Sequence, residues 1–236
     1  MALALAASVL AGACGTTSGD AAGAPATGAS GEPRTIVLFS RTEGFRHSSI
    51  EPAVEALRPR LTAEGFAVVA TEDPDALQGA VDGGAVAAVV FVSTTGDVLD
   101  PPHEAAMERF VRAGGGFAGV HAAADTEYDW PFYGELLGTW FADHPPVAPG
   151  TVERTDVAHR STAGLPDPWA RVDEWYRFRS APAGRSVLLT HDGEPVAWSG
   201  TVDDGAVWYT ALGHTDESWA DPLFVDHVVA GITSVT

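Results

Sequence analysis

Three histidines of this chain each come shortly after a run of residues that is typical of a buried β-strand. His121 directly follows the apolar run Gly116–Val120, and His47 and His214 lie in the segments after two other such runs. Histidine can exchange protons near neutral pH, and its neutral ring is a common metal ligand. Ligands of an open parallel sheet bind at the carboxyl ends of its strands, so we expect at least two of these histidines to line one pocket.

The segment 119–123, Gly-Val-His-Ala-Ala, is typical of a sharp turn from a strand into a helix. Such a turn lifts one side chain out of the sheet, toward the helix N-terminus. Hydrolases and amidotransferases place Ser or Cys there, whereas this chain has His121. A helix N-terminus disfavours an imidazolium, so we predict a neutral His121 that serves as a base, a hydrogen-bonding group or a metal ligand. The alternative is a packing histidine at a tight turn.

Carboxylates occur where they could complete this histidine site. Asp173 and Glu174 alternate along a predicted strand, so only one of them is expected to face the site, and we assign that place to Glu174. His121, His214 and Glu174 would form a two-histidine, one-carboxylate set for a divalent metal. The same residues would suit metal-free acid–base catalysis. His144 is a further candidate ligand, and the sequence leaves the cofactor open because it contains no spaced metal motif.

Residues for substrate binding are expected in the same loops. Polar side chains there are candidates for holding polar groups of a substrate, and the aromatic rings are candidates for stacking on its apolar face. All seven tryptophans lie between Trp130 and Trp219, although the usual role of tryptophan is packing in or near the core. Trp130 and Trp219 are further stacking candidates. The candidate substrate-binding residues are Arg46, Thr95, Asp97, Asp125 and Trp175.

The elements that must position these residues alternate between strands and helices. Apolar runs predict parallel strands, and amphipathic runs predict a helix starting at Ser48 or Ser49 and another at Pro101–Arg112. The second half is different, with shorter strand-like runs, a hairpin signal at 203–205 and a last helix at Pro222–Ile232. We therefore predict an α/β fold with a doubly wound, mostly parallel sheet and extra short strands in the C-terminal half. The predicted strands are 35–40, 66–70, 85–92, 116–120, 172–178, 186–191, 195–199 and 207–212, and 142–165 is unassigned.

The N-terminal segment carries export signals. Residues 1–14 resemble a bacterial lipoprotein signal peptide, in which Cys14 would become the lipidated first residue of the mature protein. The alternative is a simple signal peptide cleaved after Ala13. Residues 15–33 are rich in Gly, Ala, Ser, Thr and Pro and are predicted to be a flexible linker. We therefore expect an exported protein, either a cell-envelope lipoprotein or a secreted one, with its folded domain at 34–236.

The charge of the chain excludes some partners. Asp and Glu number 32 against 13 Lys and Arg, which gives a formal net charge of -19. Such a surface repels phosphate backbones and anionic lipids. We therefore predict no nucleic-acid partner and membrane contact only through the N-terminal lipid anchor. The oligomeric state stays open.

Several motifs together resemble the ThuA-like (trehalose utilisation) domain family. The motifs lie at 42–50, 94–97, 114–125, 173–176 and 208–215. The resemblance implies a class I glutamine amidotransferase-like, flavodoxin-like fold and a link to carbohydrate use. The related amidotransferases carry a Cys at the elbow and a His-x-Glu after a late strand. His121 stands at the Cys position, His214 matches the His, and Asp216 stands in place of the Glu.

The presence of His121 at the Cys position excludes glutamine hydrolysis by the thioester route. The thioester route needs a thiolate, and the single cysteine of the chain, Cys14, lies in the leader. The resemblance instead implies an enzyme that acts on a sugar or an oxidised sugar derivative, for which the residues present offer histidine and carboxylate acid–base chemistry. His121 and His214 would transfer protons, with Glu174 and His47 beside them. The alternative is a non-catalytic carbohydrate-binding module of an envelope protein, and neither the substrate nor the reaction follows from the sequence.

Overall fold

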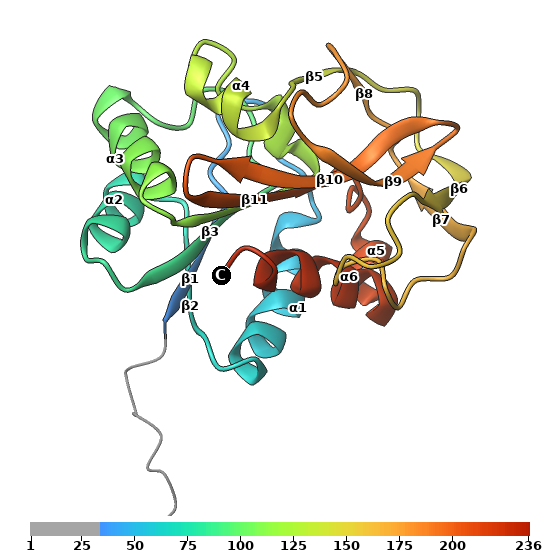
Figure 1. The fold of residues 1–236 in the computed structure, drawn as a ribbon, viewed down its shortest axis with the longest axis horizontal. Helices are drawn as coiled ribbons and strands as arrows, with labels where there is room; N and C mark the ends of the chain where they lie inside the picture. The colour runs from blue at the N-terminus through green and yellow to red at the C-terminus, as the bar shows by residue number, and fades with distance from the viewer. Residues whose placement is uncertain (1–33) are drawn as a thin grey trace, which may run out of the picture. The chain divides into compact units, whose positions relative to one another are not determined.

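A nine-stranded sheet runs through the centre of the protein (Figure 1). The structure is a computed structural model, and it describes residues 34–236. The strand order is β2-β1-β3-β4-β11-β10-β9-β6-β7, and β2 through β11 pair in parallel. The parallel strands are β1 (Thr35–Phe39), β2 (Ala67–Thr71), β3 (Val86–Val92), β4 (Gly116–Val120) and β11 (Gly205–Thr210).

The remaining strands are antiparallel and come from the second half of the chain. Beyond β11 each strand pairs antiparallel with its neighbour, and a separate two-stranded sheet joins β5 to β8. These strands are β10 (Glu194–Val202), β9 (Ser186–His191), β6 (Ala148–Arg154), β7 (Trp169–Asp173), β5 (Phe141–Asp143) and β8 (Arg177–Phe178).

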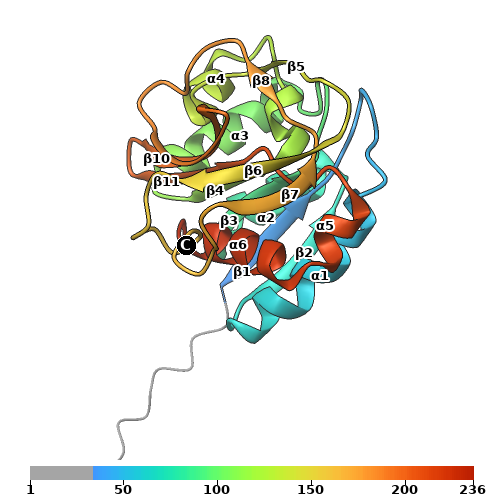
Figure 2. The same ribbon diagram turned by 90° about the vertical axis from the view of Figure 1, so that its right-hand side faces the viewer.

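Helices cover both faces of the parallel part, which makes the sheet doubly wound. One layer contains α1 (Ile50–Ala63), α5 (Asp216–Ala220) and α6 (Pro222–Thr233), which lie together in both views (Figures 1 and 2). The other layer contains α2 (Pro74–Asp82), α3 (Pro101–Arg112) and α4 (Pro131–Leu137). Because the strands between the layers lose contact with water on both faces, β3 and β4 are buried along their whole length.

The predicted fold class is confirmed, with differences at particular elements. The parallel strands and the helices at 101–112 and 222–232 lie within one or two residues of their predicted bounds. The predicted strand 172–178 is wrong as a single element, because β7 ends at Asp173 and β8 begins at Arg177. The unassigned region 142–165 contains β6, whose mixed burial reflects a surface strand with no clean alternation.

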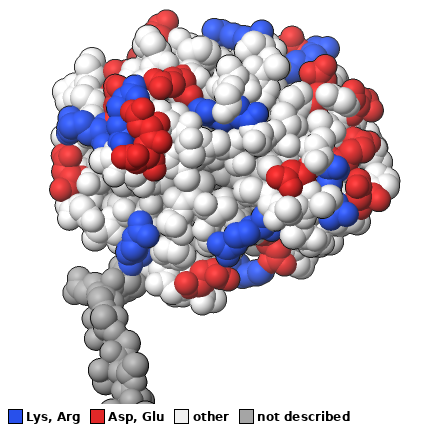
Figure 3. Space-filling view, in the orientation of Figure 1, with Lys and Arg blue, Asp and Glu red and all other residues white. Residues whose placement is uncertain are grey.

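The surface of the described domain carries charges of both signs. On the face drawn in Figure 3, acidic and basic side chains lie next to one another around a largely uncharged centre. Arg112, for example, contacts Glu108, Glu135 and Asp203. Among residues 34–236, no helix has the length and apolar character needed to cross a membrane. The predicted signal peptide, Cys14 and the linker 15–33 lie outside the described residues.

Candidate active site

Four side chains from four separate loops meet at the carboxyl edge of the parallel strands. His47, His121, His214 and Glu174 each present a nitrogen or oxygen atom, and these atoms all lie within 4.8 Å of one another. Nε2 of His121 is 3.2 Å from Nε2 of His47 and 3.2 Å from Nδ1 of His214. Oε2 of Glu174 lies 3.2 Å from the same His214 nitrogen. We call these four residues the histidine cluster.

His121 occupies the centre of the histidine cluster because of the turn that follows β4. Its backbone has φ = 52°, a left-handed conformation that costs free energy for a residue with a side chain. The turn is held by the Tyr209 hydroxyl, which donates to the His121 carbonyl at 2.7 Å. The following element η1 is a 3₁₀ helix of only five residues, His121–Asp125. The predicted strand-to-helix elbow is therefore a strand-to-3₁₀ turn.

The protonation of His121 follows from its partners. Nδ1 donates to the carbonyl of Ala211 at 2.8 Å, and a carbonyl can only accept, so the hydrogen of the neutral ring is on Nδ1. Nε2 therefore offers its lone pair to the centre of the histidine cluster. Burial, followed by the neighbouring His47, holds the pKa of His121 well below its ordinary value. The ring is neutral as predicted, but burial rather than a helix N-terminus is the leading cause.

His47 reaches the histidine cluster from the loop between β1 and α1. Thr95 holds this loop in place, because its hydroxyl donates to the carbonyl of Phe45 at 2.8 Å. The predicted substrate-binding residue Thr95 is thus fully buried and supports the loop. Burial, followed by the charge of His214, lowers the pKa of His47 to about 4, so this ring is also neutral at pH 7.

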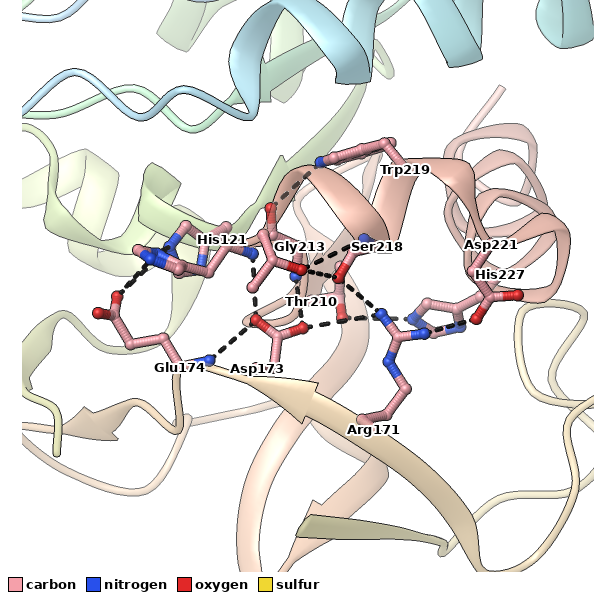
Figure 4. A network of polar contacts seen from close by, with 12 residues as sticks. His121, Arg171, Asp173, Glu174, Thr210, Gly213, Ser218, Trp219, Asp221 and His227 are labelled. Carbon is pink, nitrogen blue, oxygen red and sulfur yellow. Dashed lines mark hydrogen bonds and ion pairs between the residues drawn. The ribbon is translucent and has the colours of Figure 1, made fainter. Parts of the chain in front are cut away.

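His214 is positioned through Asp173, a residue for which the sequence analysis gave no role. The Asp173 carboxylate is fully buried and accepts the backbone N–H groups of Gly213 and His214 at 3.0 and 3.1 Å (Figure 4). It also accepts the N–H of Glu174, and Arg171 lies 3.8 Å away. Asp173 therefore joins the end of β7 to the loop after β11. It fixes the two segments that carry Glu174 and His214.

Glu174 faces the histidine cluster as predicted, but the reason given for it was wrong. Alternation along a strand allowed only one of Asp173 and Glu174 to face inward, whereas both are buried. The rule fails here because β7 ends at Asp173, so the period of two stops before Glu174. The hydrogen bond from His214 to Glu174 raises the pKa of that histidine. Glu174 therefore stabilises a positive charge on His214, while His47 and His121 stay neutral.

Three further residues complete the surroundings of the histidine cluster. The buried Tyr176 hydroxyl donates to Nε2 of His121 at 3.1 Å. Nδ1 of the exposed His144, a predicted spare ligand, lies 2.9 Å from Oε1 of Glu174. Phe45 is 67% exposed, with its ring edge-on to His47 at 4.8 Å between centroids. Tyr176 and Phe45 sit beside predicted residues within the motifs 173–176 and 42–50, which is the signal that could have found them.

Other predicted substrate-binding residues lie apart from the histidine cluster. Arg46 is exposed and pairs with Glu51 and Glu72 on the surface. Asp97 is also exposed and belongs to a second carboxylate group, with Glu104 and Glu127.

Asp125 and the tryptophans are held by other contacts. Asp125 accepts a hydrogen bond from the Tyr128 hydroxyl, and burial raises its pKa. Trp175 is buried, stacks on His191 and donates to the carbonyl of Ala148. The stacking candidates Trp130, Trp175 and Trp219 are each at most 7% exposed, so they pack and offer no open ring face.

The site departs from the amidotransferase pattern in the acidic partner of His214, as well as in having His121 at the Cys position. Asp216, which stands in place of the Glu, is exposed and accepts a hydrogen bond from Ser48 at 2.8 Å. The carboxylate that contacts His214 is instead that of Glu174, which follows the end of β7.

A cavity of about 550 Å³ between β7 and α5 includes Thr215 and Arg171 in its lining but none of the four cluster residues. Solvent reaches the cluster along His214, whose side chain is 24% exposed.

Fold and site together define a class of protein. The parallel strand order β2-β1-β3-β4-β11, with a histidine at the elbow, is a class I glutamine amidotransferase-like fold in which no described residue is a cysteine. The ThuA sequence profile, described as trehalose utilisation, matches residues 35–234. The chain therefore belongs to the ThuA trehalose utilisation family.

Solved structures agree with this fold. A ThuA-like protein from Bacteroides uniformis is 22% identical, with 89% of this chain and 94% of that chain covered and a TM-score of 0.70. A ThuA-like protein from Parabacteroides merdae is 17% identical, with coverage of 86% and 90% and a TM-score of 0.73. A protein described as a GMP synthase subunit, from Thermoplasma acidophilum, is 11% identical, with coverage of 86% and 96% and a TM-score of 0.54. No curated protein matches the chain.

Proposed function

We propose that this chain is an exported enzyme of carbohydrate utilisation that acts on a sugar or an oxidised sugar derivative at the histidine cluster. The observation that carries the proposal is the convergence of His47, His121, His214 and Glu174 at the carboxyl edge of the sheet. This edge is where ligands bind in open α/β sheets. The trehalose utilisation family supplies the substrate class. Export is the part of the proposal that depends on the leader at residues 1–14.

The protonation of the ligand-free cluster suits proton transfer. Nε2 of His121 is an unprotonated acceptor, and Glu174 stabilises the protonated form of His214, 3.2 Å from that acceptor. A base and an acid held this close can remove a proton from a substrate and return one to it. A carbon next to the carbonyl of an oxidised sugar is a suitable target. The same arrangement serves hydrolysis, isomerisation or elimination.

Phe45 supplies an aromatic surface at the rim of the histidine cluster. Its ring is 67% exposed and lies directly beside His47. Apolar C–H faces of sugars pack well on aromatic rings, and this ring lies beside a residue of the histidine cluster. We propose that Phe45 takes the stacking role that the sequence analysis gave to the tryptophans.

A substrate panel tests the proposal. The full-length protein is incubated with disaccharides, ketosugars and sugar lactones, and products are followed by NMR. We expect turnover of at least one compound, and a loss of about 100-fold or more in kcat for His121→Ala. Phe45→Ala should raise KM with little change in kcat, and Phe45→Tyr should restore KM. His103→Ala, on α3, serves as the control and should behave like the unaltered protein.

Two results would count against the proposal. Sugar binding that depends on Phe45, without turnover of any compound, would identify a carbohydrate-binding module instead of an enzyme. If the protein neither binds nor turns over any compound of the panel, the proposed substrate class is wrong.

A further inference from the structure

We infer that the histidine cluster binds one divalent transition-metal ion through His47, His121, His214 and Glu174. The inference rests on the proposed function in that it concerns the same site, but it changes the chemistry there, because with a metal bound His121 and His214 would be ligands and no longer the base and the acid. Metal binding is measurable without any sugar. The two ideas can therefore fail separately.

The crowding around one nitrogen is the first argument. Nε2 of His121 has a single lone pair, because the hydrogen of the neutral ring is on Nδ1. Three groups nevertheless lie within hydrogen-bonding distance of it: Nε2 of His47 at 3.2 Å, Nδ1 of His214 at 3.2 Å and the Tyr176 hydroxyl at 3.1 Å. One in-plane lone pair makes one good hydrogen bond, so two of these contacts are poor ones. A cation between the nitrogens would use every lone pair.

The spacing of the ligand atoms is the second argument. Four ligands at the 2.0–2.1 Å bond lengths typical of Zn²⁺ form a tetrahedron with edges of about 3.3 Å. The three contacts His47–His121, His121–His214 and His214–Glu174 are each 3.2 Å, and Oε2 of Glu174 is 3.6 Å from Nε2 of His121. Four of the six edges of such a tetrahedron are therefore matched to within a few tenths of an ångström, and the other two, from His47 to His214 and to Glu174, lie within 4.8 Å.

Supporting contacts orient the ligands, as they do in metal sites. The Ala211 carbonyl holds the His121 ring through Nδ1. His144 lies beside the second oxygen of Glu174, and Asp173 fixes the backbone of His214. His47 is the least supported ligand, because its buried Nδ1 has no hydrogen-bond partner among the described residues. We therefore expect that loss of His47 weakens metal binding less than loss of His121.

The ligand types select the class of metal. Three imidazole nitrogens and one carboxylate suit Zn²⁺ and its transition-metal neighbours, whereas Mg²⁺ and Ca²⁺ prefer sites built only from oxygen. The carboxylates of Asp97, Glu104 and Glu127 form such an all-oxygen group elsewhere in the protein. Preference for Zn²⁺ over Mg²⁺ therefore distinguishes the histidine cluster from that group. When bound, the metal would polarise a carbonyl or hydroxyl oxygen of a substrate.

Metal titration of the full-length protein tests the inference. The protein is stripped with a chelator, and Zn²⁺, Co²⁺ and Mg²⁺ are titrated by calorimetry, with the visible absorption of Co²⁺ as a second readout. We expect one Zn²⁺ or Co²⁺ per chain, no comparable binding of Mg²⁺, and a rise in Tm with metal concentration. E174Q, which keeps the size of the side chain, should weaken binding on the order of 100-fold. H121A should weaken it at least as much, and H47A less.

One variant separates this site from adventitious binding. His103 is a histidine outside the histidine cluster that also has carboxylate partners, since Nε2 contacts Asp75 and Nδ1 contacts Asp100. H103A should leave Zn²⁺ binding unchanged. Metal binding that is lost in H103A but kept in E174Q would overturn the inference, as would the absence of stoichiometric binding by a protein with an unaltered circular dichroism spectrum. Turnover of a sugar by the metal-free protein would leave the proposed function standing without the metal.

Discussion

At the scale of single residues, the histidines of the site were predictable from the sequence, whereas the residue that positions His214 was not. His47, His121 and His214 share a residue type and a position after strand-like runs, so the sequence alone grouped them. Asp173 has no such signature, because its role depends on N–H groups of Gly213 and His214, about 40 residues away in the chain. Contacts between distant backbone groups leave no local pattern, which is why the role of Asp173 was found only in the structure.

The first prediction concerns Asp173. In Asp173→Asn, an NH₂ group replaces an oxygen that accepts backbone N–H groups, and Arg171 loses a nearby negative charge. We expect a loss of about 2–4 kcal/mol in the free energy of unfolding, because buried donors are left unsatisfied. Urea unfolding measures this change.

The control for this prediction is Asp221→Asn. Asp221 also contacts Arg171, at 2.7 Å, but its side chain is 34% exposed, so water can replace the lost contact. We expect a loss below about 1 kcal/mol for this variant. Equal losses for the two variants would contradict the role assigned to Asp173.

The second prediction concerns His227, a buried histidine on α6 that is not part of the histidine cluster. Burial lowers the pKa of His227 to about 4, although Nδ1 donates to the Ser161 carbonyl at 2.7 Å. Between pH 4 and 6.5 the unfolded chain therefore binds a proton that the folded protein does not. The contribution of His227 to the free energy of unfolding is therefore fully present above pH 6.5. It decreases as the pH drops toward 4, by up to about 3 kcal/mol.

His227→Gln removes this titration while keeping a polar side chain of similar size. We expect the free energy of unfolding of the variant to fall less between pH 7 and pH 4.5 than that of the unaltered protein. Urea titrations at the two pH values measure the difference. The same drop in both proteins would show that His227 does not contribute to acid sensitivity.

At the scale of elements, apolar runs predicted the strands that are buried on both faces, and mixed surfaces were not predictable. The residues of β3 are all buried, so their sequence is continuously apolar and easily recognised. Residues of β6 are partly exposed on both faces and include Pro149 and Gly150, so neither alternation nor an apolar run marks this strand. The short α5 has only five residues, too few for a helical pattern.

The third prediction compares two helical glycines with opposite surroundings. A Cβ on Gly231, in α6, would lie 2.2 Å from the indole of the buried Trp208 on β11. We expect Gly231→Ala to destabilise the protein by about 1–3 kcal/mol through overpacking. A Cβ on Gly79, in α2, would meet no atom within 4 Å, so Gly79→Ala should stabilise by about 0.5–1 kcal/mol. Thermal unfolding of both variants is the measurement, and a shift of the same sign would contradict the close contact between α6 and β11.

At the scale of the whole molecule, the arrangement of the sheet completes the histidine cluster. In the strand order, β7 is separated from β11 by β10, β9 and β6. Asp173 at the end of β7 nevertheless bonds to Gly213 and His214 after β11, so the antiparallel half curls back over the parallel half. The cluster is therefore shared between the two halves of the sheet. Local sequence patterns predicted the parallel half, but they missed β6, merged β7 with β8 and contained no information on this closure.

Export is the last property to test, and it depends on the leader alone. Residues 1–14 lie outside the described residues, and their sequence resembles a lipoprotein signal that ends before Cys14. We predict that Cys14 is lipidated in a bacterial host and that the residues before it are absent from the mature protein. A lipid anchor would move the protein into the detergent phase because its acyl chains are apolar. Without an anchor, a chain with a formal net charge of -19 is expected to stay in the aqueous phase. Cys14→Ser should shift it to the aqueous phase, as followed by detergent partitioning and by mass spectrometry of the N-terminus. Unchanged partitioning in Cys14→Ser, with a mature chain beginning after Ala13 in both proteins, would replace lipidation by simple secretion.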